Sequence, residues 1–191
     1  MEAFLVSTGI VAFAEIGDKT QLLAFLLAAK FRKPVPILLG ILVATLVNHG
    51  FAGALGAWIT SVAEPSAMRW ILGISFICMG IWILVPDRID ADEAKPSRYG
   101  IFGATLIAFF FAEIGDKTQI ATIALAAQYK AFFTVVAGTT LGMMIANVPA
   151  VLIGDRLANQ MPVRLVHGIA AIIFVTIGLL TLFGAGARFG F

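Results

Sequence analysis

The amino-acid sequence predicts an all-α fold: a bundle of six transmembrane helices built from two inverted repeats of three helices each. The chain is 60% hydrophobic and only 13% charged, unlike an ordinary soluble domain. Its apolar residues gather in six runs that approach or exceed the roughly 20 residues needed to cross the hydrocarbon core of a bilayer. One stretch of eight residues also occurs twice without a change. These three observations carry the prediction.

The apolar runs are continuous rather than alternating, so we expect helices and not the strands of a barrel. In chain order, the expected helices span residues 4–28, 35–59, 69–85, 100–127, 132–153 and 164–183. The first run follows no basic segment and is too long for the apolar part of a signal peptide, so we treat it as a retained span. The expected units are a first repeat at 1–86, a linker at 87–99 and a second repeat at 100–191.

The duplicated stretch indicates how the two halves are related. Residues 14–21 and 112–119 both read A-E-I-G-D-K-T-Q, and each copy lies inside an apolar run. Further pairs at the same offset of 98 residues are Ser7 with Thr105, Gly40 with Gly138, and Gly56 with Gly154. Each half holds three spans. Because three is odd, the second half should enter the membrane from the opposite side, as in transporters with inverted repeats.

Basic residues in the expected loops predict the sidedness. One side holds Lys30, Arg32, Lys33, Arg88, Lys95, Arg98, Arg156 and Arg164, and the other holds Arg69, Lys130 and Arg188. The more basic side should be cytoplasmic, which puts the linker in the cytoplasm and both termini on the other side of the membrane. The net charge of +2 and the lack of a basic run interleaved with aromatic residues argue against nucleic-acid binding.

Two acids in each copy of the motif are candidate ligands for a metal ion: Glu15 and Asp18, and Glu113 and Asp116. A charged carboxylate at membrane depth costs ~3 kcal/mol even on a lenient scale, so four in matched positions point to a function. Residues three apart share a helix face, so the two acids of one motif should project together. If the halves pack motif against motif, the four carboxylates meet near the membrane midplane.

The ligand chemistry favours a hard cation. Carboxylate oxygens suit Mg²⁺, Ca²⁺ and Mn²⁺, and no His or Cys accompanies them at ligand spacing, which argues against zinc, copper and nickel. Lys19 and Lys117 reduce the charge of the two motifs from −4 to −2. One divalent cation would cancel that remainder, and two protons would do so in its absence. We therefore expect exchange, with cation and protons competing for the same carboxylates.

Other residues of the motif have supporting roles. Lys19 follows Glu15 by four residues, a spacing that favours an ion pair. The glycine that precedes the aspartate in each copy has two expected roles: to let the opposite helix approach, or to let its own helix unwind so that backbone carbonyls can also bind the ion.

Two further polar residues of each motif are secondary candidates. Gln21 shares the face of Asp18 and is the better candidate for a ligand or an orienting group. Thr20 would join the site only if the helix is irregular. The equivalents in the second motif are Gln119 and Thr118.

Four polar residues outside the motif are further candidates. Asn48 and Asn147 lie in the second span of each half and pair if one residue is inserted. Their amide oxygens could serve the site, and hydrogen bonding between helices is an equally good explanation. His49 has no equivalent at that alignment, and we favour packing over a proton relay. His167, near the cytoplasmic end of the sixth span, is expected to be incidental.

The E-x-G-D-K-T motif, present twice among six short spans, resembles that of Golgi-type manganese/calcium:proton exchangers. The chain looks most like their short bacterial members, which export manganese. The resemblance implies that Glu15, Asp18, Glu113 and Asp116 bind the transported ion, Mn²⁺ ahead of Ca²⁺, in exchange for protons and without a cofactor. The long N-terminal extension of eukaryotic relatives is missing, which implies a multi-pass protein of a bacterial inner (plasma) membrane.

Three other functions compete with this interpretation. An intramembrane aspartyl-type hydrolase would use Asp18 and Asp116 as a dyad sharing a proton, but it leaves the glutamates and lysines without a role. A passive cation channel is the second, and the inverted repeat and short loops argue against it. A structural membrane subunit is the third, in which Glu15, Asp18 and Lys19 only tie helices together.

Overall fold

A computed structural model describes residues 1–85, 99–153 and 163–184 of the 191-residue chain. Within these residues every regular element is a helix, so the all-α prediction is confirmed. The helices are α1 (Glu2–Glu15), α2 (Lys19–Phe31), α3 (Pro34–Val62), α4 (Pro65–Trp82), α5 (Gly100–Glu113), α6 (Lys117–Tyr129), α7 (Phe132–Ile153) and α9 (Val163–Leu182). The expected linker at 87–99 lies outside the described residues except for its last position.

The two expected spans that carry the motif are each divided. Residues 4–28 form α1 and α2, and residues 100–127 form α5 and α6. The divisions fall at Gly17 and Gly115, whose φ angles of 82° and 74° lie in the left-handed region. Glycine adopts that region at little cost, and this left-handed conformation prevents the preceding helix from continuing. Of the two roles expected of these glycines, close approach of another helix or unwinding of their own, the φ angles favour unwinding.

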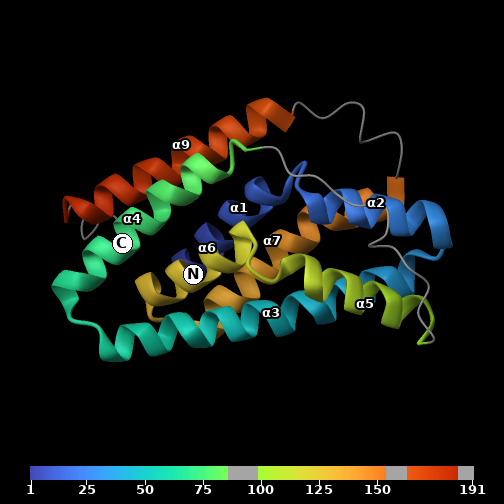
Figure 1. Cartoon of the computed structure of the whole chain (residues 1–191), viewed down its shortest axis with the longest axis horizontal. Helices are drawn as coiled ribbons and strands as arrows, with labels where there is room; N and C mark the ends of the chain where they lie inside the picture. The colour runs from blue at the N-terminus through green and yellow to red at the C-terminus, as the bar shows by residue number, and fades with distance from the viewer. Residues whose placement is uncertain (86–98, 154–162, 185–191) are drawn as a thin grey trace.

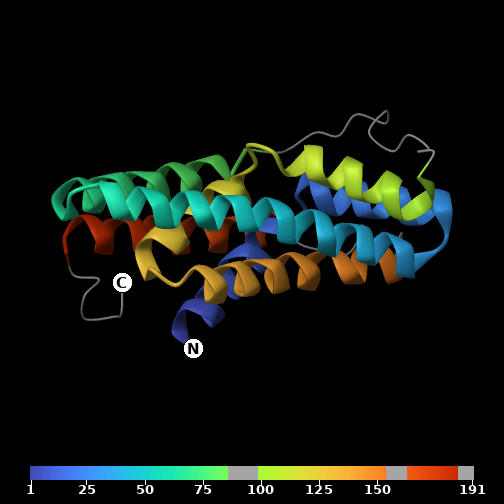
Figure 2. The same ribbon diagram turned by 90° about the horizontal axis from the view of Figure 1, so that it is seen from below.

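The other expected spans agree with single helices. Three described helices are long and apolar enough to cross a membrane by themselves: Pro34–Val62, Phe132–Ile153 and Arg164–Leu182. Pro34 lies in the first turn of α3, where its missing N–H would have no partner inside the helix. The helix α3 extends along the length of the molecule (Figure 2).

Equivalent helices of the two halves run in opposite directions (Figure 1). The pair α1 and α2 leads toward one end of the molecule, and the pair α5 and α6 leads back from that end. The same relation holds between α3 and α7 and between α4 and α9. The long helices α3 and α7 contact each other, while α3 also packs against α5 and α7 against α1.

One close contact between the two halves is made twice, at equivalent places. Gly40 of α3 lies against Thr105 of α5, and Gly138 of α7 lies against Ser7 of α1. A Cβ atom at Gly40 would stand 2.8 Å from the Cβ of Thr105, and one at Gly138 would stand 3.0 Å from that of Ser7. These four residues are two pairs at the 98-residue offset. Glycine therefore lets the helices of two equivalent pairs, α3 with α5 and α7 with α1, approach closely at equivalent places, as small residues do in membranes.

The helices α4 and α9 depart from this equivalence. They pack against each other, and the rings of Phe76 and Phe174, which are equivalent at the offset, have centroids 6.3 Å apart. Together they stand against α1 and α6 (Figure 1). Exchanging the two repeats would put them against α5 and α2 instead, where contact among the described residues is at most marginal.

Candidate metal centre

The two helix breaks, at Gly17 between α1 and α2 and at Gly115 between α5 and α6, position the acids of both motifs. Glu15 is the last residue of α1, Lys19 is the first of α2, and Asp18 occupies the N-cap between them. Asp116 holds the same place before α6. Each acid therefore stands at a helix end rather than on the side of a continuous helix.

The glutamines of the motif stabilise the breaks. The backbone N–H of Gly17 donates to Oε1 of Gln21 over 2.8 Å, and that of Gly115 donates to Oε1 of Gln119 over 2.8 Å. The side-chain amide of Gln21 also donates to the carbonyl of Ala146 in α7 over 2.9 Å. Of the two expected roles of Gln21, ligand or orienting group, the contacts favour the second.

Three carboxylates from the two motifs meet in the interior. One oxygen each from Glu15, Glu113 and Asp116 lies within 4.8 Å of the other two, and all three side chains are buried. Oε1 of Glu15 and Oε1 of Glu113 are buried without a hydrogen-bond partner among the described residues. Oxygens that share a Ca²⁺ ion lie about 2.3–2.6 Å from it, so they stand up to about 5 Å apart. The cluster has the spacing and the ligand type for one hard divalent cation.

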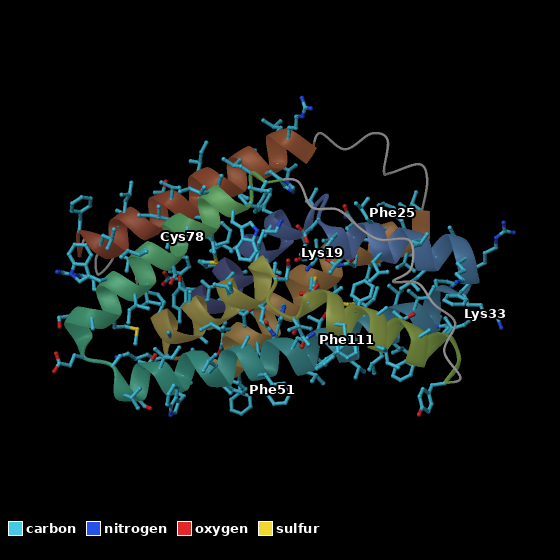
Figure 3. All side chains as sticks on the ribbon, in the orientation of Figure 1. Lys19, Phe25, Lys33, Phe51, Cys78 and Phe111 are labelled. Atoms are coloured by element: carbon cyan, nitrogen blue, oxygen red, sulfur yellow. The ribbon has the colours of Figure 1, made fainter. Side chains whose placement is uncertain are left out.

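Each lysine pairs with the aspartate of the other motif. Nζ of Lys19 is 3.3 Å from Oδ1 of Asp116, and Nζ of Lys117 pairs with Oδ1 of Asp18. The predicted pair between Lys19 and Glu15 is wrong, because the break removes the helical turn that would have brought them together. The two pairs cross between the halves. Figure 3 shows Lys19 near the middle of the molecule, far from Lys33 at one end.

Asp18 differs from the other predicted ligands. It is as fully buried as they are, at 1% exposed, but it lies outside the cluster of three and beside Lys117. Its equivalent, Asp116, keeps an oxygen in the cluster while also pairing with Lys19. The two motifs are therefore identical in sequence and unequal in this arrangement.

The threonines of the motif reach the glutamates across the breaks. Oγ1 of Thr20 donates to Oε2 of Glu15 over 2.5 Å. Oγ1 of Thr118 lies 3.1 Å from Oε2 of Glu113 and 3.3 Å from Oδ2 of Asp116. The helix is irregular here, which was the condition for Thr20 to join the site.

The side-chain amides of the two asparagines donate to backbone carbonyls of the helices. Nδ2 of Asn48 donates to the carbonyl of Phe110 in α5 over 3.1 Å, and Nδ2 of Asn147 donates to the carbonyl of Met143 in its own helix over 3.0 Å. Neither contact involves an acid. Of the two expected roles, the contact of Asn48 favours hydrogen bonding between helices, whereas the bond of Asn147 stays within α7 and supports neither role.

His49 has an equivalent after all. Because α3 and α7 are continuous helices, no residue is inserted, and the 98-residue offset relates His49 to Asn147 and Asn48 to Ala146. The offset without an inserted residue therefore does not pair the two asparagines with each other. His49 is fully buried, and its Nδ1 is 3.0 Å from Oγ1 of Thr139 in α7. It links the two long helices.

One contact at the site has no signal in the sequence. Nε2 of His167 in α9 is 2.7 Å from the backbone oxygen of Ile16, which lies in the first break. The two residues are 151 positions apart, and no local pattern relates them. His167, which was expected to be incidental, therefore contacts the backbone of the first motif.

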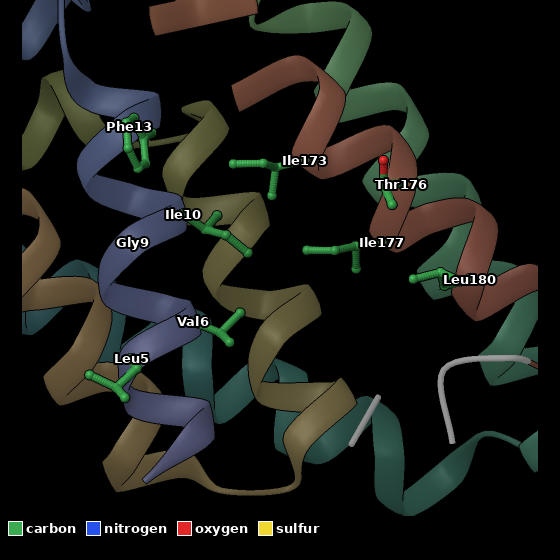
Figure 4. Close-up of a pocket in the computed structure, with 9 residues that line it drawn as sticks. All are labelled: Leu5, Val6, Gly9, Ile10, Phe13, Ile173, Thr176, Ile177 and Leu180. Atoms are coloured by element: carbon green, nitrogen blue, oxygen red, sulfur yellow. The ribbon is translucent and has the colours of Figure 1, made fainter. Parts of the chain in front are cut away.

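A pocket between α1 and α9 is separate from the acids. Its walls are apolar except for Thr176 and run from Leu5 to Phe13 on α1 and from Ile173 to Leu180 on α9 (Figure 4). With no charged group in its lining, it has no ligand for a cation.

Comparison with known proteins identifies relatives along nearly the whole chain. A family model described as "Divalent cation/proton antiporter GDT1" matches residues 3–91 and 101–188. A Vibrio cholerae protein named "Putative manganese exporter" is 50% identical over 184 residues, which cover 96% of this chain and 92% of the relative. GDT1-like protein 5 of Arabidopsis thaliana is 26% identical, covering 95% of this chain and 96% of the relative. GDT1-like protein 3 of Oryza sativa is 26% identical, covering 91% and 71%. No solved structure matches.

A helical bundle with apolar spans and an acidic cluster buried between its halves is typical of a membrane cation transporter. The chain belongs to the GDT1 family of divalent cation/proton antiporters, and each matched block of the family model contains one copy of the motif. The resemblance seen in the sequence is confirmed. The protein is a transporter and not an enzyme.

Proposed function

We propose that the protein exports Mn²⁺ from the cytoplasm in exchange for protons, with Ca²⁺ as the alternative cargo. The observation that carries the proposal is the meeting of Glu15, Glu113 and Asp116, one oxygen of each within 4.8 Å of the others, in a buried cluster to which both halves contribute. Carboxylate oxygens suit both ions. The preference for Mn²⁺ rests on the name of the Vibrio cholerae relative.

The proposed architecture has six spans in two inverted repeats. The spans are α1 with α2, α3, α4, α5 with α6, α7, and α9. Support comes from the opposite directions of equivalent helices and from the glycine contact that recurs at the offset. We place the repeats at 1–86 and 100–191, the linker in the cytoplasm, both termini on the opposite side and the whole protein in a bacterial inner membrane. The basic residues of the loops support this sidedness.

Charge balance explains why cation and protons should be exchanged. Four acids and two lysines leave the two motifs with a charge of −2. Uncompensated charge within the membrane is costly, so the site should change sides only when one divalent cation or two protons have neutralised it. This condition couples the two fluxes.

Asp18 belongs to the proposed site although it is outside the cluster in this arrangement. It is the equivalent of Asp116, and an exchange of the roles of the two repeats would bring Asp18 to the glutamates and release Asp116. Lys117 is 3% exposed and Lys19 is 24% exposed, so the two crossed pairs already differ in their access to solvent. We infer that the arrangement described is one of two.

The crossed pairs argue against the hydrolase. A catalytic dyad needs two aspartates that share a proton. Asp18 and Asp116 are each beside a lysine, and they face different ones.

Reconstitution tests the proposed function. Purified protein in proteoliposomes is expected to take up Mn²⁺ when the lumen is acidic, and parallel assays with Ca²⁺, Mg²⁺ and Zn²⁺ rank the cargo. The double variant Glu15→Gln and Glu113→Gln should abolish uptake. The control variant Glu2→Gln, at the exposed start of α1, should keep it. Uptake that ignores the imposed pH gradient would refute exchange, and unitary currents in a planar bilayer would favour the channel.

A further inference from the structure

The backbone has the same conformation at the two helix breaks, but different residues cover them. Ile16 and Ile114 end α1 and α5 with ψ angles of 114° and 119°. Ile114 is 52% exposed, whereas Ile16 is partly buried and its carbonyl meets the ring of His167 at 2.7 Å. Because a carbonyl oxygen can only accept, Nε2 of His167 carries the hydrogen and donates it.

The first repeat has no counterpart of this contact. The residue equivalent to His167 at the 98-residue offset is Arg69 of α4. Arg69 is exposed, and its guanidinium lies beside Gly184, near the end of α9. His167 is 9% exposed and points to the centre of the molecule instead. Equivalent positions on two equivalent helices therefore have different partners.

The contact joins α9 to α1 beside the cluster. Farther along the same two helices, the apolar pocket separates them, and the space around Gly9 is open (Figure 4). Ile16 directly follows Glu15, so a fixed Ile16 carbonyl fixes the backbone from which the Glu15 carboxylate projects. Thr20 holds the other end of that side chain.

We propose that His167 is a positioning residue of the first motif: its ring holds the Ile16 carbonyl and thereby keeps Glu15 in the cluster while α4 and α9 rest against α1 and α6. This inference rests on the proposed function for its effect on transport. The contact itself does not depend on that function.

Kinetic measurements on reconstituted protein test the role. In His167→Ala, the KM for Mn²⁺ should rise about fivefold, the effect of one hydrogen bond of about 1 kcal/mol, while the maximal rate stays within about twofold. His167→Gln keeps an N–H donor at a similar reach and should restore most of the affinity, whereas His167→Phe fills the space without a donor and should not. Arg69→Ala, at the equivalent position, should leave KM unchanged.

A labelling experiment tests the contact without transport. In protein whose Cys78 is replaced by Ser, Ile16→Cys should react with a maleimide several-fold faster once His167→Ala is added. Ile114→Cys should react at the same rate with or without His167→Ala. Equal KM values for His167→Gln and His167→Phe, or an unchanged labelling rate at position 16, would overturn the proposal. Absence of any ion uptake by the unmodified protein would refute the proposed function, and the labelling result would still stand.

Discussion

Lys117, at the start of α6, forms its ion pair with Asp18, at the N-cap of α2, so the second motif neutralises an acid of the first. Lys19 does the same for Asp116 in the opposite sense. In both of these ion pairs the lysine and the aspartate come from different halves. Both halves therefore contribute to the site, and a substitution in one motif should affect the other motif as well.

Removal of Lys117 should cost more stability than removal of Lys19. Lys117→Met leaves Asp18 buried without its lysine, and breaking a buried pair in this way typically costs about 3–5 kcal/mol. Lys19 is 24% exposed, so water can replace it beside Asp116 and Lys19→Met should be milder. Heating in detergent followed by size-exclusion chromatography measures both. Adding Asp18→Asn to Lys117→Met should recover part of the loss, and a larger loss for Lys19→Met would contradict the crossed arrangement.

Asp18→Asn and Asp116→Asn should both abolish Mn²⁺ transport, although only Asp116 lies in the cluster described. In the proposed mechanism, an exchange of roles between the repeats makes each aspartate a ligand in one of the two arrangements. The measurement is Mn²⁺ uptake into proteoliposomes, with exposed Glu64→Gln as the matched control. Normal uptake by Asp18→Asn would mean that Asp116 alone serves throughout the cycle.

Thr20→Val should weaken ion binding because Oε2 of Glu15 loses its hydroxyl donor. The loss of a hydrogen bond worth about 1 kcal/mol should raise the KM for Mn²⁺ about fivefold. Thr20→Ser keeps the hydroxyl and should behave almost as the unmodified protein does. If Thr20→Ser were as impaired as Thr20→Val, the methyl group and not the hydrogen bond would be the important part.

Gly138→Ala should destabilise the bundle, since a Cβ there would come within 2.7 Å of the backbone oxygen of Phe4. Overpacking of this kind costs about 1–3 kcal/mol. The control is Gly50→Ala, in a helix of the same type, where nothing lies within 4 Å of the added atom. Unfolding in denaturant, followed by tryptophan fluorescence, should separate the two variants, and equal stability would count against the close approach of α7 to α1.

Proton coupling predicts a definite sign for the pH dependence. Protons and Mn²⁺ bind the same carboxylates in the proposed mechanism, so lowering the pH on the side from which Mn²⁺ binds should raise its KM. Acidifying the opposite side should speed its uptake. Uptake measured over a series of inner and outer pH values checks both effects, and nigericin, which dissipates the gradient, should remove the second. Identical rates at every pH combination would exclude exchange.

The apolar runs predicted α3, α7 and α9 well because length and hydrophobicity depend on the chain alone. Unwinding at Gly17 and Gly115 was one of the two roles expected of these glycines. A glycine in an apolar helix serves either packing or unwinding, and only the neighbouring helices decide which. Keeping the 98-residue offset strictly would have paired His49 with Asn147 from the sequence.

Contacts between residues far apart in the chain could not be predicted from the sequence. The pairs of Lys19 with Asp116 and of Lys117 with Asp18 depend on how two broken helices meet. The bond between His167 and Ile16 depends on where α9 rests, and its equivalent position in α4 does not make one. A repeat in the sequence predicts what the two halves share and gives no information about where they differ.

The breaks also put main-chain dipoles to use. An unbroken helix has its charged ends at the two membrane surfaces, whereas α1, α2, α5 and α6 end or begin beside the carboxylates. The last carbonyls of α1 and α5 bring partial negative charge toward the proposed cation site, and the first N–H groups of α2 and α6 bring partial positive charge toward Asp18 and Asp116. The backbone itself thus supplies an electric field in the interior of the bundle, at a place where side chains alone would have to create it.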